Sequence, residues 1–184
     1  MTAPGSEPPG RAGHVVLVGM MGTGKTTTGR RLAETLGRGF ADSDLLIEAE
    51  TGRTVRQIFE SDGEPAFRRL ETDALARALA RPEPTVVAAA GGVVLDPTNR
   101  DLLHRSGATV VWLRAPVSVL VGRVGRSDHR PAVKDDPAGT LQTMEDTRTE
   151  LYREVADAVV DSSAPVEDVV ASIVAAVHER EGAA

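Results

Sequence analysis

Short apolar runs alternate with longer segments of helical period along most of this chain. Such runs, rich in valine, leucine and alanine, are typical of buried strands. We expect strands at residues 15–18, 39–41, 86–89, 109–113 and 158–160. Strands that alternate with helical segments predict an α/β fold, in which helices cover both faces of a central parallel five-stranded sheet. Ligands are then expected beyond the carboxyl ends of the strands.

Two of the helical segments have clear sequence signatures. Residues 26–36 carry apolar and small side chains at helical spacing, and Gly37 supplies a C-terminal stop. Residues 165–180 place valines and one isoleucine on a single face, a pattern that predicts packing against the core.

Composition limits the classes of protein that remain. A length of 184 residues suits one domain with a real core, and we expect it to span residues 14–184. Residues 1–13 contain three prolines and three glycines and lack the apolar centre of a signal peptide, so we expect a disordered tail. No later apolar stretch approaches the length of a membrane span.

Charge and cysteine content narrow the setting further. The chain has no cysteine, which excludes disulfides, thiol catalysis and cysteine-ligated zinc, and which fits a cytoplasmic location. A formal net charge of −6 argues against a general affinity for the nucleic-acid backbone. We therefore expect a protein that binds neither membrane nor nucleic acid.

The strongest motif is a phosphate-binding loop. Residues 19–26 read GMMGTGKT, a complete G-x-x-x-x-G-K-[ST] sequence between a predicted strand and a predicted helix. The glycines let backbone N–H groups face a polyphosphate, the lysine reaches the β and γ phosphates, and the threonine hydroxyl ligates Mg²⁺. The residues expected to bind the nucleotide are Gly22, Thr23, Gly24, Lys25, Thr26 and Thr27. A glycine-rich turn without a ligand is the alternative.

Two carboxylates follow the second predicted strand. Asp42 and Asp44 therefore lie at the same sheet edge as the phosphate-binding loop. In phosphoryl transfer, one carboxylate can hold Mg²⁺ through water and another can orient the attacking hydroxyl and accept its proton. We assign these roles to Asp42 and Asp44, respectively. The alternative is that one of them only caps the helix expected to begin near Leu45.

Further motifs follow in a fixed order. They read FADSD at 40–44, IF at 58–59, GEPAFRRLE at 63–71, AGGVV at 90–94, HRP at 129–131 and RTELY at 148–152. In this order they resemble the shikimate kinase family over nearly all of the chain after the tail. The resemblance implies a single-domain P-loop kinase fold with a mobile lid over about residues 122–136. It also implies phosphorylation of the 3-hydroxyl of shikimate by ATP with Mg²⁺, and we expect a monomer.

The resemblance assigns roles to individual residues. Lys25, Asp44 and Arg130 would be catalytic, Arg123 and Arg130 would bind ATP, and Thr26 and Asp42 would hold the metal. The residues implied to bind shikimate are Asp44, Phe59, Phe67, Arg68, Gly91, Gly92 and Arg148.

Each of these assignments has a structural alternative. Arg68 and Arg148 have acidic neighbours and could form ordinary helical ion pairs. The two phenylalanines could be core residues, and Arg123 could simply favour a helix C-terminus.

The chain also departs from the family pattern. Ala90 stands where the glycine turn normally begins, which costs about 1 kcal/mol if that position needs a positive φ. Glu150 replaces a proline, with a small expected effect. Two other functions therefore stay open: a kinase of a shikimate analogue, gluconate or a nucleoside, and a nucleotide-binding regulatory protein without activity.

Overall fold

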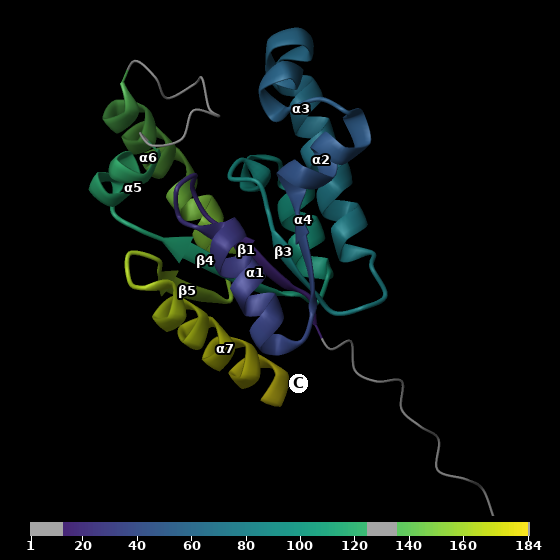
Figure 1. The fold of residues 1–184 in the computed structure, drawn as a ribbon, viewed down its shortest axis with the longest axis vertical. Helices are drawn as coiled ribbons and strands as arrows, with labels where there is room; N and C mark the ends of the chain where they lie inside the picture. The colour runs from purple at the N-terminus through teal and green to yellow at the C-terminus, as the bar shows by residue number, and fades with distance from the viewer. Residues whose placement is uncertain (1–12, 125–135, 184) are drawn as a thin grey trace, which may run out of the picture.

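The structure of the protein is a computed structural model that describes residues 13–124 and 136–183. Within these residues the strands form one parallel sheet in the order β2-β3-β1-β4-β5 (Figure 1). The strands are β1 (Val15–Val18), β2 (Gly39–Asp42), β3 (Thr85–Ala88), β4 (Thr109–Arg114) and β5 (Ala158–Asp161). The predicted α/β fold is confirmed, and each predicted strand agrees with an observed one to within one residue at either end.

Helices fill the connections between the strands. They are α1 (Lys25–Leu36), α2 (Ser43–Thr51), α3 (Val55–Leu79), α4 (Pro97–Arg105), α5 (Val117–Val124), α6 (Pro137–Val155) and α7 (Val166–Gly182), with a short 3₁₀ helix, η1 (Val93–Leu95). Gly37 ends α1 in the left-handed conformation, where its N–H bonds the carbonyl of Ala33, so the predicted helix stop is confirmed.

Alternate residues of the central strand pack into two separate cores. Val15 and Leu17 face α1 and α7, whose buried residues include Leu32 and Ile173. The opposite face of the sheet packs against α3, α4 and α6. This alternation follows from the two-residue period of a strand, and covering both faces explains why the runs are almost wholly apolar. The predicted apolar face of the last helix is confirmed as part of the first core.

Helices α2 and α3 have a small core of their own. Ile47 of α2 packs there with Ile58 and Phe67 of α3. Helix α3 is kinked at Gly63, which has a φ of 78°, and Pro65 follows the kink. In Figure 1, α2 and α3 project on one side of the molecule, while α5 and the start of α6 project on the other. The phosphate-binding loop therefore lies between two helical pairs.

Parts of the sequence predictions fall outside this description. The predicted tail, apart from Gly13, and the predicted lid between residues 125 and 135 are not among the described residues, so the domain division stays a prediction. Across the described ranges, none of the helices has the length and apolarity needed to cross a bilayer.

Candidate active site

The phosphate-binding loop connects β1 to α1 and depends on its glycines. Gly22 and Gly24 have positive φ values of 81° and 84°. A Cβ atom at Gly19 would come within 2.3 Å of the Leu113 carbonyl oxygen, so only glycine fits there. Gly24 is also the N-cap of α1, and no side chain caps that helix end. The first backbone N–H groups of α1 are thus placed as they are in anion-binding loops.

Two side chains fold back onto the loop itself. The Lys25 Nζ donates to the carbonyl oxygens of Gly19 at 2.7 Å and Met20 at 2.9 Å. The buried Thr23 hydroxyl donates to the Met20 oxygen at 2.8 Å. Thr23 therefore braces the loop with its side chain, and its backbone N–H bonds the same oxygen at 3.4 Å. Lys25 reaches across the concave side of the loop, where a phosphate group would bind.

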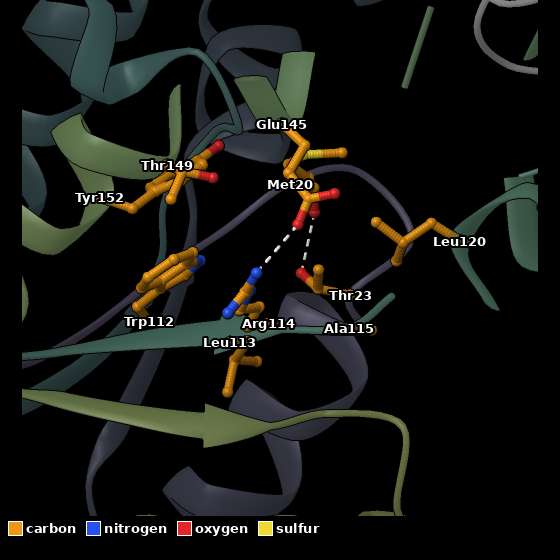
Figure 2. A pocket seen from close by; sticks show the side chains of 10 residues that line it. All are labelled: Met20, Thr23, Trp112, Leu113, Arg114, Ala115, Leu120, Glu145, Thr149 and Tyr152. Carbon is orange, nitrogen blue, oxygen red and sulfur yellow. Dashed lines mark hydrogen bonds and ion pairs between the residues drawn. The ribbon is translucent and has the colours of Figure 1, made fainter. Parts of the chain in front are cut away.

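A cavity of only about 10 Å³ lies beneath the loop, enclosed by residues that include Thr23, Leu120 and Tyr152 (Figure 2). This volume is close to that of one water molecule, so it has no room for a nucleotide. Arg114 of β4 bonds Glu145 of α6 at 3.3 Å beside it. The cavity is therefore a small packing gap next to the loop. The candidate phosphate site is instead the concave side of the loop, which Lys25 reaches across.

Asp42 uses its two carboxylate oxygens for two purposes. Its Oδ1 accepts from the backbone N–H groups of Asp44 at 3.0 Å and Leu45 at 3.3 Å, which makes Asp42 the N-cap of α2. Its Oδ2 accepts from the Thr26 hydroxyl at 2.7 Å. The capping interpretation and the pairing with Thr26 therefore both apply to the same side chain.

The Thr26 and Asp42 pair is suited to a hard cation. Both offer oxygen ligands, as Mg²⁺ requires. Within residues 13–124 and 136–183, no cluster of three histidine, aspartate or glutamate side chains is placed to hold a metal by itself. A cation bound between Thr26 and Asp42 would thus take its remaining ligands from phosphate and water, as Mg²⁺ does in many nucleotide sites.

The half-buried Asp44 lies in the first turn of α2, where the helix dipole favours a negative charge. The motif segment at residues 63–71, on α3, supplies charges next to Asp44. Arg68 donates to Glu71 at 2.5 Å and to Glu64 at 2.8 Å. Helical ion pairs were the structural alternative for Arg68, and they are present, but Glu71 is only 2% exposed. Burial raises the pKa of Glu71, the Arg68 guanidinium opposes this rise, and the nearby Asp44 carboxylate adds to it.

The glycine turn after β3 brings these charges together with α6. An ideal Cβ atom at Gly92 would lie 1.8 Å from Nη1 of Arg68, so the guanidinium packs directly against the α-carbon of this glycine. From α6, Nη1 of Arg148 donates to the Gly91 carbonyl oxygen at 3.2 Å. The Tyr152 hydroxyl donates to the same oxygen at 2.6 Å. Each of the two predicted arginines therefore contacts one of the two predicted glycines.

The remaining sequence departures have little structural consequence in the described residues. Among those residues only glycines have positive φ, so Ala90 is not strained and the expected penalty at this position does not arise. Glu150 is 77% exposed and pairs with Arg153, away from Arg148. Both family differences are accommodated locally.

Aromatic residues border this region on α3. The rings of Phe59 and Phe67 have centroids 4.5 Å apart. Phe67 is buried among Ile47 and Ile58, as the core interpretation expected, whereas Phe59 is only partly buried. The Arg68 guanidinium carbon lies 5.7 Å from the Phe67 ring centroid, so this pair of rings also supports the arginine.

Arg123 lies in the last turn of α5 and joins two loops. It donates to the carbonyl oxygens of Gly22 at 3.2 Å and Ser162 at 2.9 Å. It therefore stands at the edge of the phosphate-binding loop, next to the turn that follows β5. The predicted catalytic Arg130 lies outside the described residues.

Two further residues of this site, Glu71 and Tyr152, were not assigned a role from the sequence. Both occur within the quoted motif segments, 63–71 and 148–152. Their place in those motifs was the available signal. Neither side chain could be tied to a partner without knowledge of the tertiary contacts.

The fold and the site together define a class. The sheet is parallel and carries a phosphate-binding loop after β1, and a charged region lies between α2, α3 and α6. This arrangement is typical of a P-loop small-molecule kinase. The family model for shikimate kinase matches residues 21–178. The chain belongs to the shikimate kinase family.

Individual relatives agree with this assignment. A shikimate kinase from Symbiobacterium thermophilum is 43% identical over 171 residues, which cover 91% of this chain and 97% of the relative. The solved structure of a shikimate kinase from Acinetobacter baumannii in complex with shikimate is 39% identical, with a TM-score of 0.84 over 88% of this chain and 90% of that one. A gluconokinase from Sinorhizobium meliloti 1021 is 27% identical, with a TM-score of 0.67 over 91% of this chain and 93% of that one. This chain is therefore an ATP-using kinase of the shikimate kinase type, not of the gluconokinase type.

Proposed function

We propose that this chain transfers the γ-phosphoryl group of ATP to the 3-hydroxyl of shikimate. The observation that supports the proposal most is that both Arg68 and Arg148 contact the Gly91–Gly92 turn. Guanidinium groups bind a carboxylate with paired hydrogen bonds, and shikimate carries one carboxylate. A neutral sugar would not need two arginines at this place.

The acceptor hydroxyl would be activated by Asp44. Its carboxylate would orient the hydroxyl and take its proton as the oxygen bonds to the γ phosphorus. The bond from that phosphorus to the β–γ bridging oxygen breaks, and the electron pair leaves with ADP. Backbone N–H groups of Gly91 and Gly92 would hold a second hydroxyl of the ring.

The loop residues would stabilise the transferred group. The Lys25 ammonium, which now bonds two carbonyl oxygens of its own loop, would exchange them for β and γ phosphate oxygens. The backbone N–H groups from Gly22 to Thr27 would bind the remaining phosphate oxygens. The phosphate oxygens would thus become charged partners of Lys25 when the nucleotide binds.

A bound Mg²⁺ would supply positive charge to the phosphates. The residues that would hold it are Thr26, through its hydroxyl, and Asp42, through water. Their contact at 2.7 Å keeps both oxygens at the mouth of the loop.

Other assignments complete the proposal. Arg123 would lie along the adenine base, Phe59 and Phe67 would pack near the shikimate ring, and Arg130 would neutralise charge on the phosphoryl group. We also infer that the protein is a monomer, which light scattering coupled to size-exclusion chromatography would test. The cytoplasmic location stays a prediction.

The direct test is an ADP-release assay with MgATP and shikimate, in parallel with gluconate and a panel of nucleosides. Mass spectrometry of the product distinguishes transfer from ATP hydrolysis. We expect saturable formation of shikimate monophosphate. Transfer only to another acceptor would reject the proposed substrate, and ATP binding without transfer would support the regulatory alternative.

A variant of the loop tests the chemistry. Lys25→Met should lower kcat by about a hundredfold or more, since it removes charge stabilisation at the transferred group. Arg31→Met is the matched control, because Arg31 is a cation on the same helix whose side chain is 59% exposed and pairs only with Glu34 among the contacts described. Equal activity of the two variants, with unchanged circular dichroism, would remove Lys25 from the mechanism.

A further inference from the structure

The carbonyl oxygen of Gly91 receives two hydrogen bonds from one helix. Tyr152 donates at 2.6 Å and Arg148 at 3.2 Å, and these residues lie one turn apart on α6. Positions four apart share a helix face, so both donors approach the glycine turn from the same direction. The peptide that links Gly91 to Gly92 is therefore held from the side of α6.

Tyr152 is itself rigidly placed. Its side chain is 1% exposed, and its ring stacks on that of Trp112 in β4 with centroids 5.6 Å apart. Figure 2 shows the side chains of Tyr152 and Trp112 next to each other. Burial raises the pKa of Tyr152 to about 12, so the hydroxyl keeps its proton and remains a donor at neutral pH.

Holding one end of a peptide group also orients the other end. The Gly91 carbonyl and the Gly92 N–H belong to one planar unit and point in opposite directions in a trans peptide. A carbonyl fixed toward α6 directs the Gly92 N–H away from α6. Backbone bonds from the Val93 N–H to the Ala90 carbonyl oxygen at 3.1 Å and from the Leu95 N–H to the Gly92 carbonyl oxygen at 2.9 Å already shape the turn. Because glycine has no side chain to restrict its backbone, the bonds from α6 further limit the orientation of the Gly91–Gly92 peptide.

We propose that Tyr152 is a positioning residue that sets the Gly92 N–H for the second ring hydroxyl of the substrate, the one that is not phosphorylated. This inference rests on the proposed function, which assigns that N–H to the substrate. Arg148, also proposed to bind the substrate carboxylate, donates to the same oxygen as Tyr152. The tyrosine hydroxyl thus keeps the turn in place when Arg148 turns toward the substrate.

The alternative is that Tyr152 only fills the core. Tyr152→Phe separates the two roles because it keeps the ring and removes the hydroxyl. The control is Val155→Ala, which removes buried apolar volume from the next turn of α6 and touches no hydrogen bond of the site. Trp112 is the only tryptophan, so its emission reports whether the stacked ring is undisturbed.

We expect Tyr152→Phe to raise the KM for shikimate about three- to tenfold, with the KM for ATP and the Trp112 emission unchanged. Val155→Ala should lower the melting temperature without changing either KM. If Tyr152→Phe leaves the KM for shikimate at the wild-type value, or if Val155→Ala raises it equally, Tyr152 is only a core residue.

A second measurement does not depend on turnover. In ¹⁵N NMR spectra of the ligand-free protein, the Gly92 amide should shift or broaden in Tyr152→Phe and not in Val155→Ala. An unshifted Gly92 amide overturns the positioning role even if shikimate is phosphorylated. A shifted amide in a protein that phosphorylates no shikimate would keep the role of Tyr152 in fixing the turn and reject the proposed substrate.

Discussion

Replacing Gly92 with alanine directly tests the proposed arginine clamp, in which Arg68 and Arg148 bind the shikimate carboxylate. The new Cβ atom would lie 1.8 Å from Nη1, 2.5 Å from Cζ and 2.9 Å from Nη2 of Arg68. These distances are far below van der Waals contact, so the guanidinium must move. The Gly92 backbone itself can accept the methyl group, because its φ of −91° is ordinary for an L-residue.

The size of the effect follows from what Arg68 would lose. A hydrogen bond to a charged partner contributes about 1.5–3 kcal/mol, which corresponds to about 10- to 150-fold in kcat/KM. We expect this loss for shikimate, because the displaced guanidinium would no longer reach the carboxylate. The KM for ATP should stay near the wild-type value, since the polar contacts given for Arg68 are with Glu64 and Glu71 and not with the phosphate-binding loop.

Steady-state kinetics with each substrate varied in turn measures both constants. Gly182→Ala is the matched control, since its Cβ would meet no atom within 4 Å and the residue ends α7 far from the site. In an Arg68→Ala background, Gly92→Ala should have little further effect, because its target is gone. A wild-type kcat/KM for shikimate in Gly92→Ala, or full additivity with Arg68→Ala, would refute the clamp.

Three more predictions concern other parts of the site. Asp42→Asn keeps an oxygen to cap α2 and removes the charge beside Thr26. Its melting temperature should therefore stay near the wild-type value, whereas the Mg²⁺ concentration for half-maximal activity should rise, which titration with Mg²⁺ measures. Ala90→Gly should cost about 0.4–1 kcal/mol of stability in urea unfolding and leave the KM for shikimate unchanged, because Ala90 has no positive φ to relieve. For Tyr152, whose pKa of about 12 exceeds the ordinary value near 10, the folded protein retains a proton that the unfolded chain loses. Its contribution is therefore complete below about pH 10 and falls by up to about 1.4 kcal/mol per pH unit up to about pH 12. The difference in unfolding free energy between wild type and Tyr152→Phe, measured in urea, should therefore be constant below about pH 10 and change only in that range.

Much of the fold could be predicted because its signals are local. Strands covered on both faces require continuous apolar runs, and the left-handed turn at Gly37 requires a residue without a Cβ atom. The phosphate-binding loop is equally local, since its glycines serve backbone geometry within eight residues of sequence. At Asp42 two local interpretations competed. The cap on α2 is confirmed and uses one carboxylate oxygen, while the role of Asp42 in holding Mg²⁺ stays a prediction for the other oxygen, which bonds Thr26.

The acceptor region could be predicted only in part, because its contacts are distant in sequence. Tyr152 bonds Gly91 across 61 positions, and no spacing rule links such residues. Arg68 illustrates the same limit. Its neighbours Glu64 and Glu71 predict an ordinary surface pair, yet Glu71 is buried where α3 meets the glycine turn. Burial, which changes the energetics of the pair, arises only from the tertiary packing.

The Arg68–Glu71 pair is better explained by positioning than by stability. Burial raises the pKa of Glu71 despite the opposing Arg68 charge, so ionising this carboxylate costs the folded protein more than the unfolded chain. Buried ion pairs often stabilise a fold less than apolar residues of similar volume. What the pair does provide is a fixed guanidinium, held by Glu71 at 2.5 Å and pressed against Gly92. A guanidinium that is already oriented loses little freedom when it binds a carboxylate, so this preorganisation would favour the substrate binding proposed for Arg68.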